Sequence, residues 1–215
     1  MNVIEELIEA GRAIVAAGLV KGTGGNLSGR EGEIILITRS GADLGRLTPA
    51  DFVAIHPKSK IQNPKSVRPS SELAMHLSAY QARPEAQVVF HVHPPKAISL
   101  GLLGLALPAL TPDFYLHLGP AVPLLPYITP TTEALAAAAG DVLRDNPAVL
   151  LQNHGVVVVG QSVAQAQLRL ELLEEHAAIY LDALAGGRPR SLTAGEMRQL
   201  DEVTGGRYQV MSEKC

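Results

Sequence analysis

The spacing between short β-branched segments restricts the fold of this chain more than any other feature. Segments 33–37 and 51–56 are rich in Val, Ile and Leu, as are segments 148–152 and 155–159, and only loop residues separate the two members of each pair. Segments of this composition, bounded by turn residues, predict β-strands. Parallel neighbours are usually joined by a crossover helix, so strand pairs without one favour antiparallel pairing and argue against a doubly wound parallel sheet.

Helical periodicity fills most of the remaining chain. Apolar residues recur at helical spacing between Ile4 and Val15, so residues 3–18 predict an amphipathic helix. Ser70 and Ser71 provide hydroxyl caps for a second helix that extends to about residue 82. Further helices are predicted at residues 96–103, 132–145, 162–185 and 193–204, and further strands at residues 87–93 and 121–125.

This order of elements predicts the fold class. Helices between the strands form layers on the sheet faces. The prediction is therefore an α/β protein, a single three-layer α/β/α domain with a mixed central sheet. A length of 215 residues is closer to one domain than to two. We expect the domain to span residues 1–215, with a flexible tail over about residues 205–215.

The charge balance argues against two classes of partner. The chain has 18 Lys and Arg residues against 21 Asp and Glu residues, a formal net charge of −3. A near-neutral chain is not expected to bind nucleic acid or an acidic membrane surface. One basic group lacks interleaved aromatic residues and is interpreted as a solvated loop. It consists of His56, Lys58, Lys60, Lys65 and Arg68.

Three features favour a cytoplasmic protein. The single cysteine, Cys215, excludes an intramolecular disulfide and fits a reducing compartment. Glu5 and Glu6 interrupt the segment where a secretory signal would need an apolar run, so no targeting segment is predicted. The uncharged stretch 97–112 is too short for a bilayer, which takes about 20 residues, and the stretch 114–132 contains four prolines. No membrane span is therefore expected.

His91 and His93 carry the strongest local chemical signal. They occupy positions i and i+2 of the predicted strand 87–93, so both imidazoles point to the same face of the sheet. Pro94 and Pro95 end the strand directly afterwards, at a strand end where a cleft can open. Two rigid imidazoles in this position suit a metal ion, but the pair alone fits two satisfied core or edge histidines equally well.

His154 and Glu72 offer further ligands for such a site. His154 lies in a tight turn between two apolar strands, and alone it fits a turn histidine bonded to backbone. Glu72 lies in the first turn of its helix, where the helix dipole favours a carboxylate on structural grounds. Three imidazoles and one carboxylate nevertheless satisfy tetrahedral zinc, with the carboxylate displaceable by substrate. His76, at i+4 from Glu72, is interpreted as a supporting or core histidine.

Three loops offer sites for an anion. The glycine-rich segment from Lys21 to Ser28 lacks the third glycine of the dinucleotide fingerprint and the Gly-Lys-Ser/Thr of a P-loop. Its backbone N–H groups can still wrap an anion. Ser40-Gly41 and Ser70-Ser71 offer the same chemistry, the latter at a predicted helix N-terminus. Each loop alone is more often just a turn.

Taken in order along the chain, these segments resemble the class II aldolase family. The resemblance covers about residues 1–185, and the ordered set is specific even though each segment is weak alone. The matching segments are Gly22-Thr23-Gly24-Gly25-Asn26-Leu27-Ser28, Thr38-Arg39-Ser40-Gly41, Pro69-Ser70-Ser71-Glu72, Tyr80-Gln81-Ala82-Arg83-Pro84, His91-Val92-His93-Pro94 and Gln152-Asn153-His154-Gly155.

The resemblance implies a zinc enzyme that forms or cleaves an aldol bond in a ketose 1-phosphate, giving dihydroxyacetone phosphate and an aldehyde. It implies that Glu72 acts as acid and base at the hydroxymethylene carbon. The implied metal ligands are His91, His93, His154 and Glu72. The implied phosphate-binding residues are Thr23, Asn26, Ser40, Gly41, Ser70 and Ser71.

The resemblance also implies a homotetramer with the site at a subunit interface. In the family's aldolase, a tyrosine of the neighbouring subunit donates a proton. Tyr115 is our candidate for that catalytic residue. The segment Asp113-Phe114-Tyr115-Leu116 leaves open whether Phe114 or Tyr115 matches the position.

Several activities remain open within this family. A glutamate at position 72 favours an aldolase over the related ribulose-phosphate 4-epimerases, which carry an aspartate there. Methylthioribulose-1-phosphate dehydratases and sugar-acid phosphate decarboxylases share the metal site. Imidazole and carboxylate ligands also accept manganese or cobalt in place of zinc. A non-catalytic interaction module, as in adducin heads, is expected to lack the metal ligands that this chain has.

Overall fold

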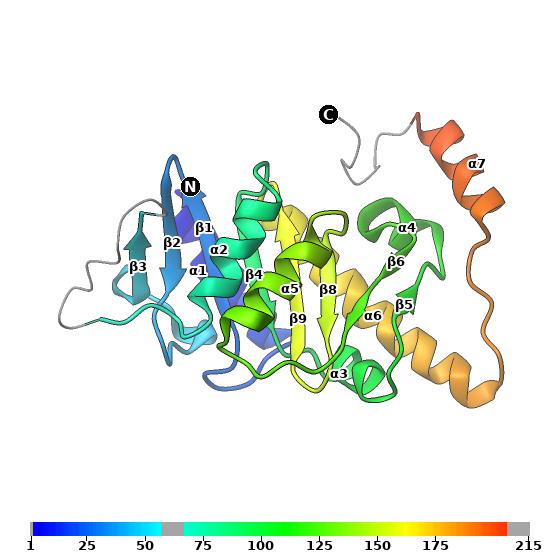
Figure 1. Ribbon diagram of the computed structural model, residues 1–215, viewed down its shortest axis with the longest axis horizontal. Coiled ribbons are helices and arrows are strands. Elements are labelled where there is room, and N and C mark those ends of the chain that lie inside the picture. The colour runs from blue at the N-terminus through cyan, green and yellow to red at the C-terminus, as the bar shows by residue number, and fades with distance from the viewer. Residues whose placement is uncertain (1, 57–66, 206–215) are drawn as a thin grey trace.

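The computed structural model describes residues 2–56 and 67–205. The main sheet, most of whose strands are labelled in Figure 1, consists of β1 (Asn26–Glu31), β2 (Ile34–Thr38), β3 (Phe52–Ile55), β4 (Val88–Val92), β7 (Leu124–Leu125), β8 (Ala148–Leu151) and β9 (Gly155–Gly160). They lie in the order β3-β2-β1-β4-β9-β8-β7. β7 and β8 run parallel, and the other neighbouring pairs are antiparallel. The predicted mixed sheet is therefore confirmed.

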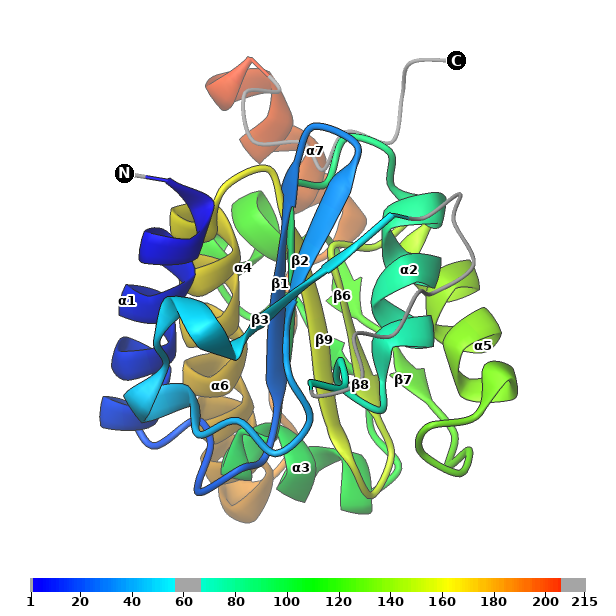
Figure 2. The ribbon, with the colours of Figure 1, turned by 90° about the vertical axis from the view of Figure 1, so that its left-hand side faces the viewer.

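Helices cover both faces of this sheet, which Figure 2 shows nearly edge-on. One face carries α1 (Val3–Ala16), α3 (Pro95–Leu102), α4 (Pro112–Leu118) and α6 (Val163–Gly186). The other face carries α2 (Leu73–Ala82) and α5 (Glu133–Leu143). β5 (Leu107–Pro108) and β6 (Ala121–Val122) form a separate two-stranded sheet, and α7 (Ala194–Thr204) packs against α4. The three-layer α/β/α architecture is confirmed.

Strand β4 contributes to two hydrophobic cores, one on each face of the sheet. Val88, Phe90 and Val92 pack with residues of α1, α3 and α6, whereas Val89 packs with residues of α2 and α5. Successive side chains of a strand point to opposite faces, so this alternation places His91 on the face covered by α2. The α2 face therefore receives the histidines predicted to bind metal.

Two boundaries differ from the predictions at the ends of loops. Strand β1 begins at Asn26, inside the segment interpreted as a glycine-rich loop, because Leu27 is buried and pairs across to β4. Helix α2 begins at Leu73 rather than at Ser70. The Ser70 N–H donates to the carbonyl oxygen of Thr38, which holds Ser70 in an extended bridge beside β2. The bridge between Arg39 and Pro69 keeps the segment just before it extended as well, so the helix starts only after this segment.

The proline-rich region also differs from the predictions. Helix α4 was missed, since its few residues follow Pro112 directly and show little periodicity. The Thr111 hydroxyl caps it by accepting from the Phe114 N–H. The single strand predicted at residues 121–125 is two short strands in different sheets, because Pro123 separates β6 from β7.

Some predictions fall outside the described residues. The predicted tail lies outside them apart from Gly205, and so do Lys58, Lys60 and Lys65 of the basic group. His56 and Arg68 are exposed, as expected for a solvated loop. In the described parts of the chain, no helix is long and apolar enough to cross a membrane.

One end of the sheet, the lower end in Figure 1, collects the segments singled out in the sequence. Asn26 at the start of β1 pairs with His91 near the end of β4. Gly155 at the start of β9 pairs with Leu151 at the end of β8. Because these strand ends are neighbours, residues from distant parts of the sequence meet there.

Candidate metal and substrate site

Three histidines converge at this end of the sheet, and we call them the histidine cluster: His91 on β4, His93 just after β4, and His154 in the turn between β8 and β9. One ring nitrogen of each lies within 4.8 Å of the others. The Nε2 atoms of His91 and His93 are 3.1 Å apart. The ring centroids are 4.7 to 5.2 Å apart. This convergence is the arrangement that a bound divalent cation requires.

Glu72 faces the cluster from the start of α2. Its Oε2 atom lies 2.7 Å from His91 Nε2, and its Oε1 atom lies 3.7 Å from His154 Nε2. Its backbone N–H donates to the Ser70 hydroxyl at 3.2 Å, just ahead of the helix. Burial alone raises the pKa of this carboxyl, but the hydrogen bond and charge of His91, with His154 and Asn26, hold it at about 2. Glu72 is therefore a carboxylate at neutral pH.

The hydrogen bonding of His91 shows what the cluster can hold. Its Nδ1 atom lies 2.9 Å from the carbonyl oxygen of Val156, which can only accept, so Nδ1 carries the hydrogen. Nε2 is then the ring atom that faces the Glu72 carboxylate, and a proton or a metal ion has to lie between the two atoms. Two acceptors 2.7 Å apart repel each other unless a positive centre lies between them. Imidazole nitrogens with a carboxylate fit zinc or a similar divalent cation.

Two orphaned atoms support this fit. Among the described residues, the buried side-chain polar atoms without a hydrogen-bond partner are Glu72 Oε1 and His154 Nδ1. An unpaired buried polar atom costs about 1–3 kcal/mol, so such atoms are rare and need an explanation. Both belong to the residues predicted to bind metal.

Glycines and one strained turn let the backbone approach the rings. A Cβ atom on Gly155 would lie 2.6 Å from His93 Cδ2, and one on Gly24 would lie 3.1 Å from His93 Nδ1. Gly25 has a φ of +80°, and its Cβ would lie 2.8 Å from the His91 carbonyl oxygen. Asn153, which precedes His154, has a φ of +59°. The Gly-rich motifs of the sequence are therefore needed for close contact around the histidines.

Burial keeps two of the rings in the metal-binding form. It lowers the pKa of His93 to about 4, with help from the neighbouring His91 and His154 and against the charge of Glu72. It also lowers the pKa of His154, with help from His91 and again against Glu72. Both rings are neutral at pH 7, and only a neutral imidazole can donate a lone pair to a metal.

Asn26, predicted to bind phosphate, has its side chain between two other residues. Its Oδ1 atom lies 2.5 Å from His76 Nε2, and its side chain is also one of the groups that lower the pKa of Glu72. His76, interpreted as a supporting or core histidine, is fully buried and contacts Asn26. The sequence indicated that His76 and Glu72 share a helix face, but it did not connect either of them with Asn26.

The other residues predicted to bind phosphate lie in loops near this strand end. Segments 38–41 and 68–70 run side by side, because the Ser40 N–H donates to the Arg68 carbonyl at 2.9 Å and the Ser70 N–H to that of Thr38 at 3.1 Å. The structure thus brings the Ser40-Gly41 and Ser70-Ser71 segments together. Ser40, Gly41, Ser71 and Thr23 are exposed, whereas Ser70 is buried. Thr23 lies in the loop whose Gly24 contacts His93.

Phe114 and Tyr115 have clearly different environments. Phe114 is fully buried, with its ring centroid 5.3 Å from that of His176. Tyr115 is partly exposed, and its hydroxyl donates to Asp201 of α7 at 2.9 Å. Burial and this carboxylate raise the pKa of Tyr115. Of the two, only Tyr115 presents a polar group near the surface, and within one chain that group contacts α7 rather than the histidine cluster.

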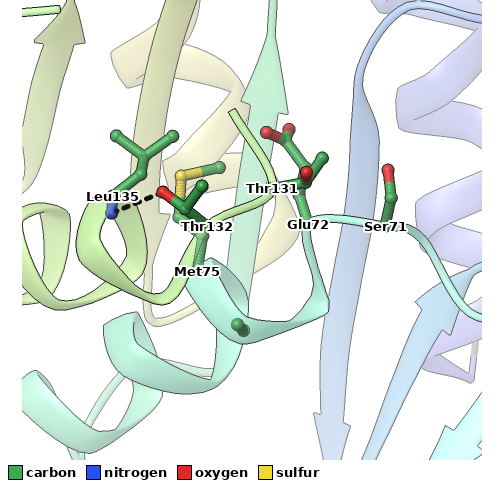
Figure 3. A pocket seen from close by; sticks show the side chains of 7 residues that line it. Ser71, Glu72, Met75, Thr131, Thr132 and Leu135 are labelled. Carbon is green, nitrogen blue, oxygen red and sulfur yellow. Dashed lines mark hydrogen bonds between the residues drawn. The ribbon is translucent and has the colours of Figure 1, made fainter. Parts of the chain in front are cut away.

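Thr131 lies beside Glu72, and nothing in the sequence singled it out. Figure 3 shows it with Glu72 and Ser71 around a cavity of about 10 Å³, which Ala74, Met75, Thr132 and Leu135 also line. Its φ of +66° is rarely adopted by a β-branched residue. Strain of this kind persists where the surroundings impose it, often at functional sites. A Gly or Asn would have signalled the positive φ, but a threonine carries no such signal.

Residues 5–181 match the family model described as Class II Aldolase and Adducin N-terminal domain. The chain belongs to this family. The match covers most of the chain and includes the histidine cluster, Glu72 and the loops around them. The resemblance seen in the ordered motifs is thereby confirmed.

Similar members of the class II aldolase family carry out more than one reaction. The chain is 36% identical over 200 residues to a 5-deoxy-D-ribulose 1-phosphate aldolase of Bacillus thuringiensis serovar kurstaki, covering 91% of this chain and 92% of that protein. It is 33% identical over 204 residues to a 3-oxo-tetronate 4-phosphate decarboxylase of Escherichia coli K12, with coverages of 91% and 93%. A solved structure of an L-fuculose 1-phosphate aldolase matches with a TM-score of 0.87 and 34% identity, covering 94% of this chain and 96% of that chain.

Proposed function

We propose that this class II aldolase binds zinc and catalyses the reversible aldol cleavage of a ketose 1-phosphate to dihydroxyacetone phosphate and an aldehyde. The observation that carries the proposal is the convergence of three imidazoles and one carboxylate, with His91 Nε2 facing Glu72 Oε2 at 2.7 Å. His91, His93 and His154 would hold the ion, and Glu72 would complete its coordination.

The loops beside the cluster support a phosphorylated substrate. Ser40, Gly41, Ser71 and Thr23 leave hydroxyl and backbone groups exposed at the same end of the sheet as the cluster. Hydroxyls and backbone N–H groups ahead of a helix bind phosphate without a buried counter-charge. A phosphate anchored there would hold the reacting carbon of the substrate in register with Glu72. In this proposal Ser70 and Asn26 border the phosphate pocket.

The proton transfer is assigned to Glu72. When bound, the metal ion supplies Lewis-acid chemistry that draws charge from the substrate carbonyl oxygen. In condensation, the Glu72 carboxylate removes a proton from the hydroxymethylene carbon of dihydroxyacetone phosphate. In cleavage, Glu72 returns a proton to that carbon once the carbon–carbon bond has broken and left its electron pair there. The low pKa of Glu72 keeps it ready for the condensation direction.

Tyr115 is proposed as the proton donor to the aldehyde oxygen, reaching the site of a neighbouring subunit in a homotetramer. Its partly exposed position and its hydrogen bond to Asp201 support this assignment, because a tyrosine that served its own subunit would face its own histidine cluster. A cytoplasmic location, expected from the single cysteine, belongs to the same proposal.

The test combines metal analysis with a substrate panel. The purified protein is expected to contain about one zinc ion per chain by elemental analysis. It is expected to release dihydroxyacetone phosphate from 5-deoxyribulose, fuculose or rhamnulose 1-phosphate in a coupled reductase assay. A chelator should abolish the release and added Zn²⁺ should restore it, with Mn²⁺ and Co²⁺ compared alongside. Failure with every ketose 1-phosphate, together with turnover of another family substrate, would contradict the aldolase assignment.

The second candidate is decarboxylation of an oxo-tetronate phosphate. The 33% identity to such a decarboxylase over nearly the whole chain favours it. Carbon dioxide release from 3-oxo-tetronate 4-phosphate by the same preparation distinguishes it from aldol cleavage. A non-catalytic module is disfavoured, because the four residues that would hold the metal are present and converge.

A further inference from the structure

A chain of buried polar side chains extends away from Glu72, and we call it the polar chain: Asn26 and Ser28 on β1, and His76 and Tyr80 on α2. His76 and Ser28 have no exposed surface. His76 Nε2 lies 2.5 Å from Asn26 Oδ1, and His76 Nδ1 lies 2.7 Å from the Ser28 hydroxyl. The Ser28 hydroxyl in turn lies 3.0 Å from that of Tyr80.

The direction of each hydrogen bond follows from the chemistry of His76. His76 has no exposed surface, and both of its ring nitrogens face uncharged side chains, those of Asn26 and Ser28, so the ring is in the neutral form with a single N–H. Asn26 Oδ1 can only accept, which puts that hydrogen on Nε2. Nδ1 must then accept from the Ser28 hydroxyl, and the oxygen of Ser28 is left to accept from Tyr80.

The same logic fixes the amide of Asn26. Because Oδ1 accepts from His76, the NH₂ group of Asn26 is the one directed to the Glu72 carboxylate. A rotated amide would place an oxygen against a carboxylate and an NH₂ against the N–H of His76. Every donor along the polar chain therefore points from Tyr80 toward Glu72.

At the end of the polar chain that is farther from Glu72, Arg30 packs against Tyr80. The guanidinium of Arg30 lies 4.9 Å from the centroid of the Tyr80 ring, and Arg30 Nη1 donates to the Pro84 carbonyl at 2.9 Å. Packing alone does not require such a network, since apolar side chains of similar volume fill a buried position at equal or lower cost. What an apolar core cannot do is orient an amide.

We propose that His76 is a positioning residue that sets the orientation of the Asn26 amide and, through it, holds the Glu72 carboxylate in the geometry needed for proton transfer. This inference rests on the proposed function, because it assigns to Glu72 the proton transfer described above. Ser28 and Tyr80 serve the same end by keeping the hydrogen of His76 on Nε2.

The first test is a double-mutant cycle between His76 and Asn26. His76→Leu should lower kcat by about 10- to 100-fold, the usual cost of losing a partner behind a metal site. Zinc content and the KM for the ketose 1-phosphate should stay within about threefold of wild type, and His76→Gln should recover part of kcat because its amide can still donate to Asn26. Since His76 acts through Asn26, the double variant with Asn26→Ala should lose no more than Asn26→Ala alone. Losses that multiply would overturn the proposal.

The matched control is Arg83→Met. Arg83 is a buried polar residue directly after α2, where it pairs with Glu85 and donates to carbonyls of α5 and its C-cap, away from Glu72. This variant should lower thermal stability as His76→Leu does, while kcat stays at the wild-type value. If both variants lower kcat equally, His76 has only a structural role.

A second measurement needs no variant and covers the case in which His76→Leu does not fold. In the zinc-loaded wild-type protein labelled with ¹⁵N-histidine, His76 should show a protonated Nε2 and an unprotonated Nδ1. The opposite tautomer would overturn the proposal. A protein without bound metal or aldol activity would instead contradict the proposed function, so the two failures are distinguishable.

Discussion

The histidine cluster and the polar chain lie side by side on the α2 face of the sheet, yet they satisfy their hydrogen bonds in opposite ways. In the polar chain, each donor of His76, Ser28 and Tyr80 meets one acceptor. In the histidine cluster, His91 Nε2 lies 2.7 Å from a carboxylate oxygen of Glu72 and 3.1 Å from His93 Nε2. Glu72 Oε1 and His154 Nδ1 have no hydrogen-bond partner among the described residues.

This difference separates the residues that can bind a metal ion from the residues that hold them in place. A fully satisfied buried network holds its members in place but has no free donor or acceptor left for a ligand. A group of ligand atoms that face one another, two of them without a hydrogen-bond partner, is costly by itself and is stabilised when a cation binds. The two arrangements predict different consequences for substitutions that look equally conservative.

The largest effect is expected from His91→Ala. Loss of one imidazole from a site of four ligands should reduce the zinc content far below one ion per chain. Removing several kcal/mol of charge stabilisation should lower kcat/KM by about 1000-fold or more. Elemental analysis and the coupled assay measure the two results. His76→Leu is the contrasting variant, since it should keep its zinc, and retained zinc in His91→Ala would break the comparison.

Glu72→Gln should separate the two roles proposed for Glu72, that of metal ligand and that of general base. The amide oxygen can still approach the metal, but it cannot accept the substrate proton. We therefore expect zinc content to fall little and kcat to fall by about 100- to 10,000-fold, the range for loss of a general base. Glu85→Gln is the control, because its carboxylate pairs with Arg83 outside the site and its loss should leave kcat unchanged. A Glu72→Gln variant with normal kcat would remove Glu72 from the mechanism.

The polar chain should also determine how the metal-free protein responds to acid. The pKa of His76 is about 3 in the folded state against about 6.5 in the unfolded chain, so below pH 6.5 the unfolded state binds the proton first. The free energy of unfolding therefore falls as the pH falls, by about 2 kcal/mol between pH 6.5 and pH 5 from His76 alone. His93 and His154 have lowered pKa values and act with the same sign.

Urea denaturation in the presence of a chelator measures this pH response. Wild type should lose stability from pH 6.5 to pH 5, and His76→Leu should lose about 2 kcal/mol less over the same interval. Tyr80→Phe, which keeps the histidine, should retain the wild-type pH dependence. Equal slopes in wild type and His76→Leu would show that His76 is already protonated in the folded state.

Much of the histidine cluster could be predicted because its residues obey local rules. The i and i+2 spacing of His91 and His93 on a strand ended by prolines fixes a shared face and a strand end. The three-residue connection between β8 and β9 likewise places His154 at the edge of the sheet. The prediction that these histidines lie close to Glu72 rested on the resemblance to the family, because no local rule says which helix covers which strand.

The polar chain could not be predicted, since it depends on the register in which β1 pairs with β4. Asn26 and Ser28 face α2 only because β1 is a strand that pairs with β4 at His91, and the glycine-rich sequence indicated a loop there. The start of α2 moved for a similar reason, since the extended pairing of residues 69 and 70 beside β2 delays the helix until after them. Long-range pairing decided both positions, and short-range propensity does not contain that information.

The smallest effect is expected at the border of the site, where two adjacent threonines should respond in opposite directions. Thr131 has a φ of +66°, so Thr131→Gly should relieve backbone strain and raise the free energy of unfolding by about 1 kcal/mol. The Thr132 hydroxyl accepts from the Leu135 N–H at 3.2 Å and caps α5, as Figure 3 shows, so Thr132→Ala should lower it by about 1 kcal/mol. Urea denaturation of both variants at pH 7 measures the difference. If Thr131→Gly also raises the KM for the ketose 1-phosphate, the strain serves the substrate site beside Glu72, whereas an unchanged KM confines it to the turn that leads into α5.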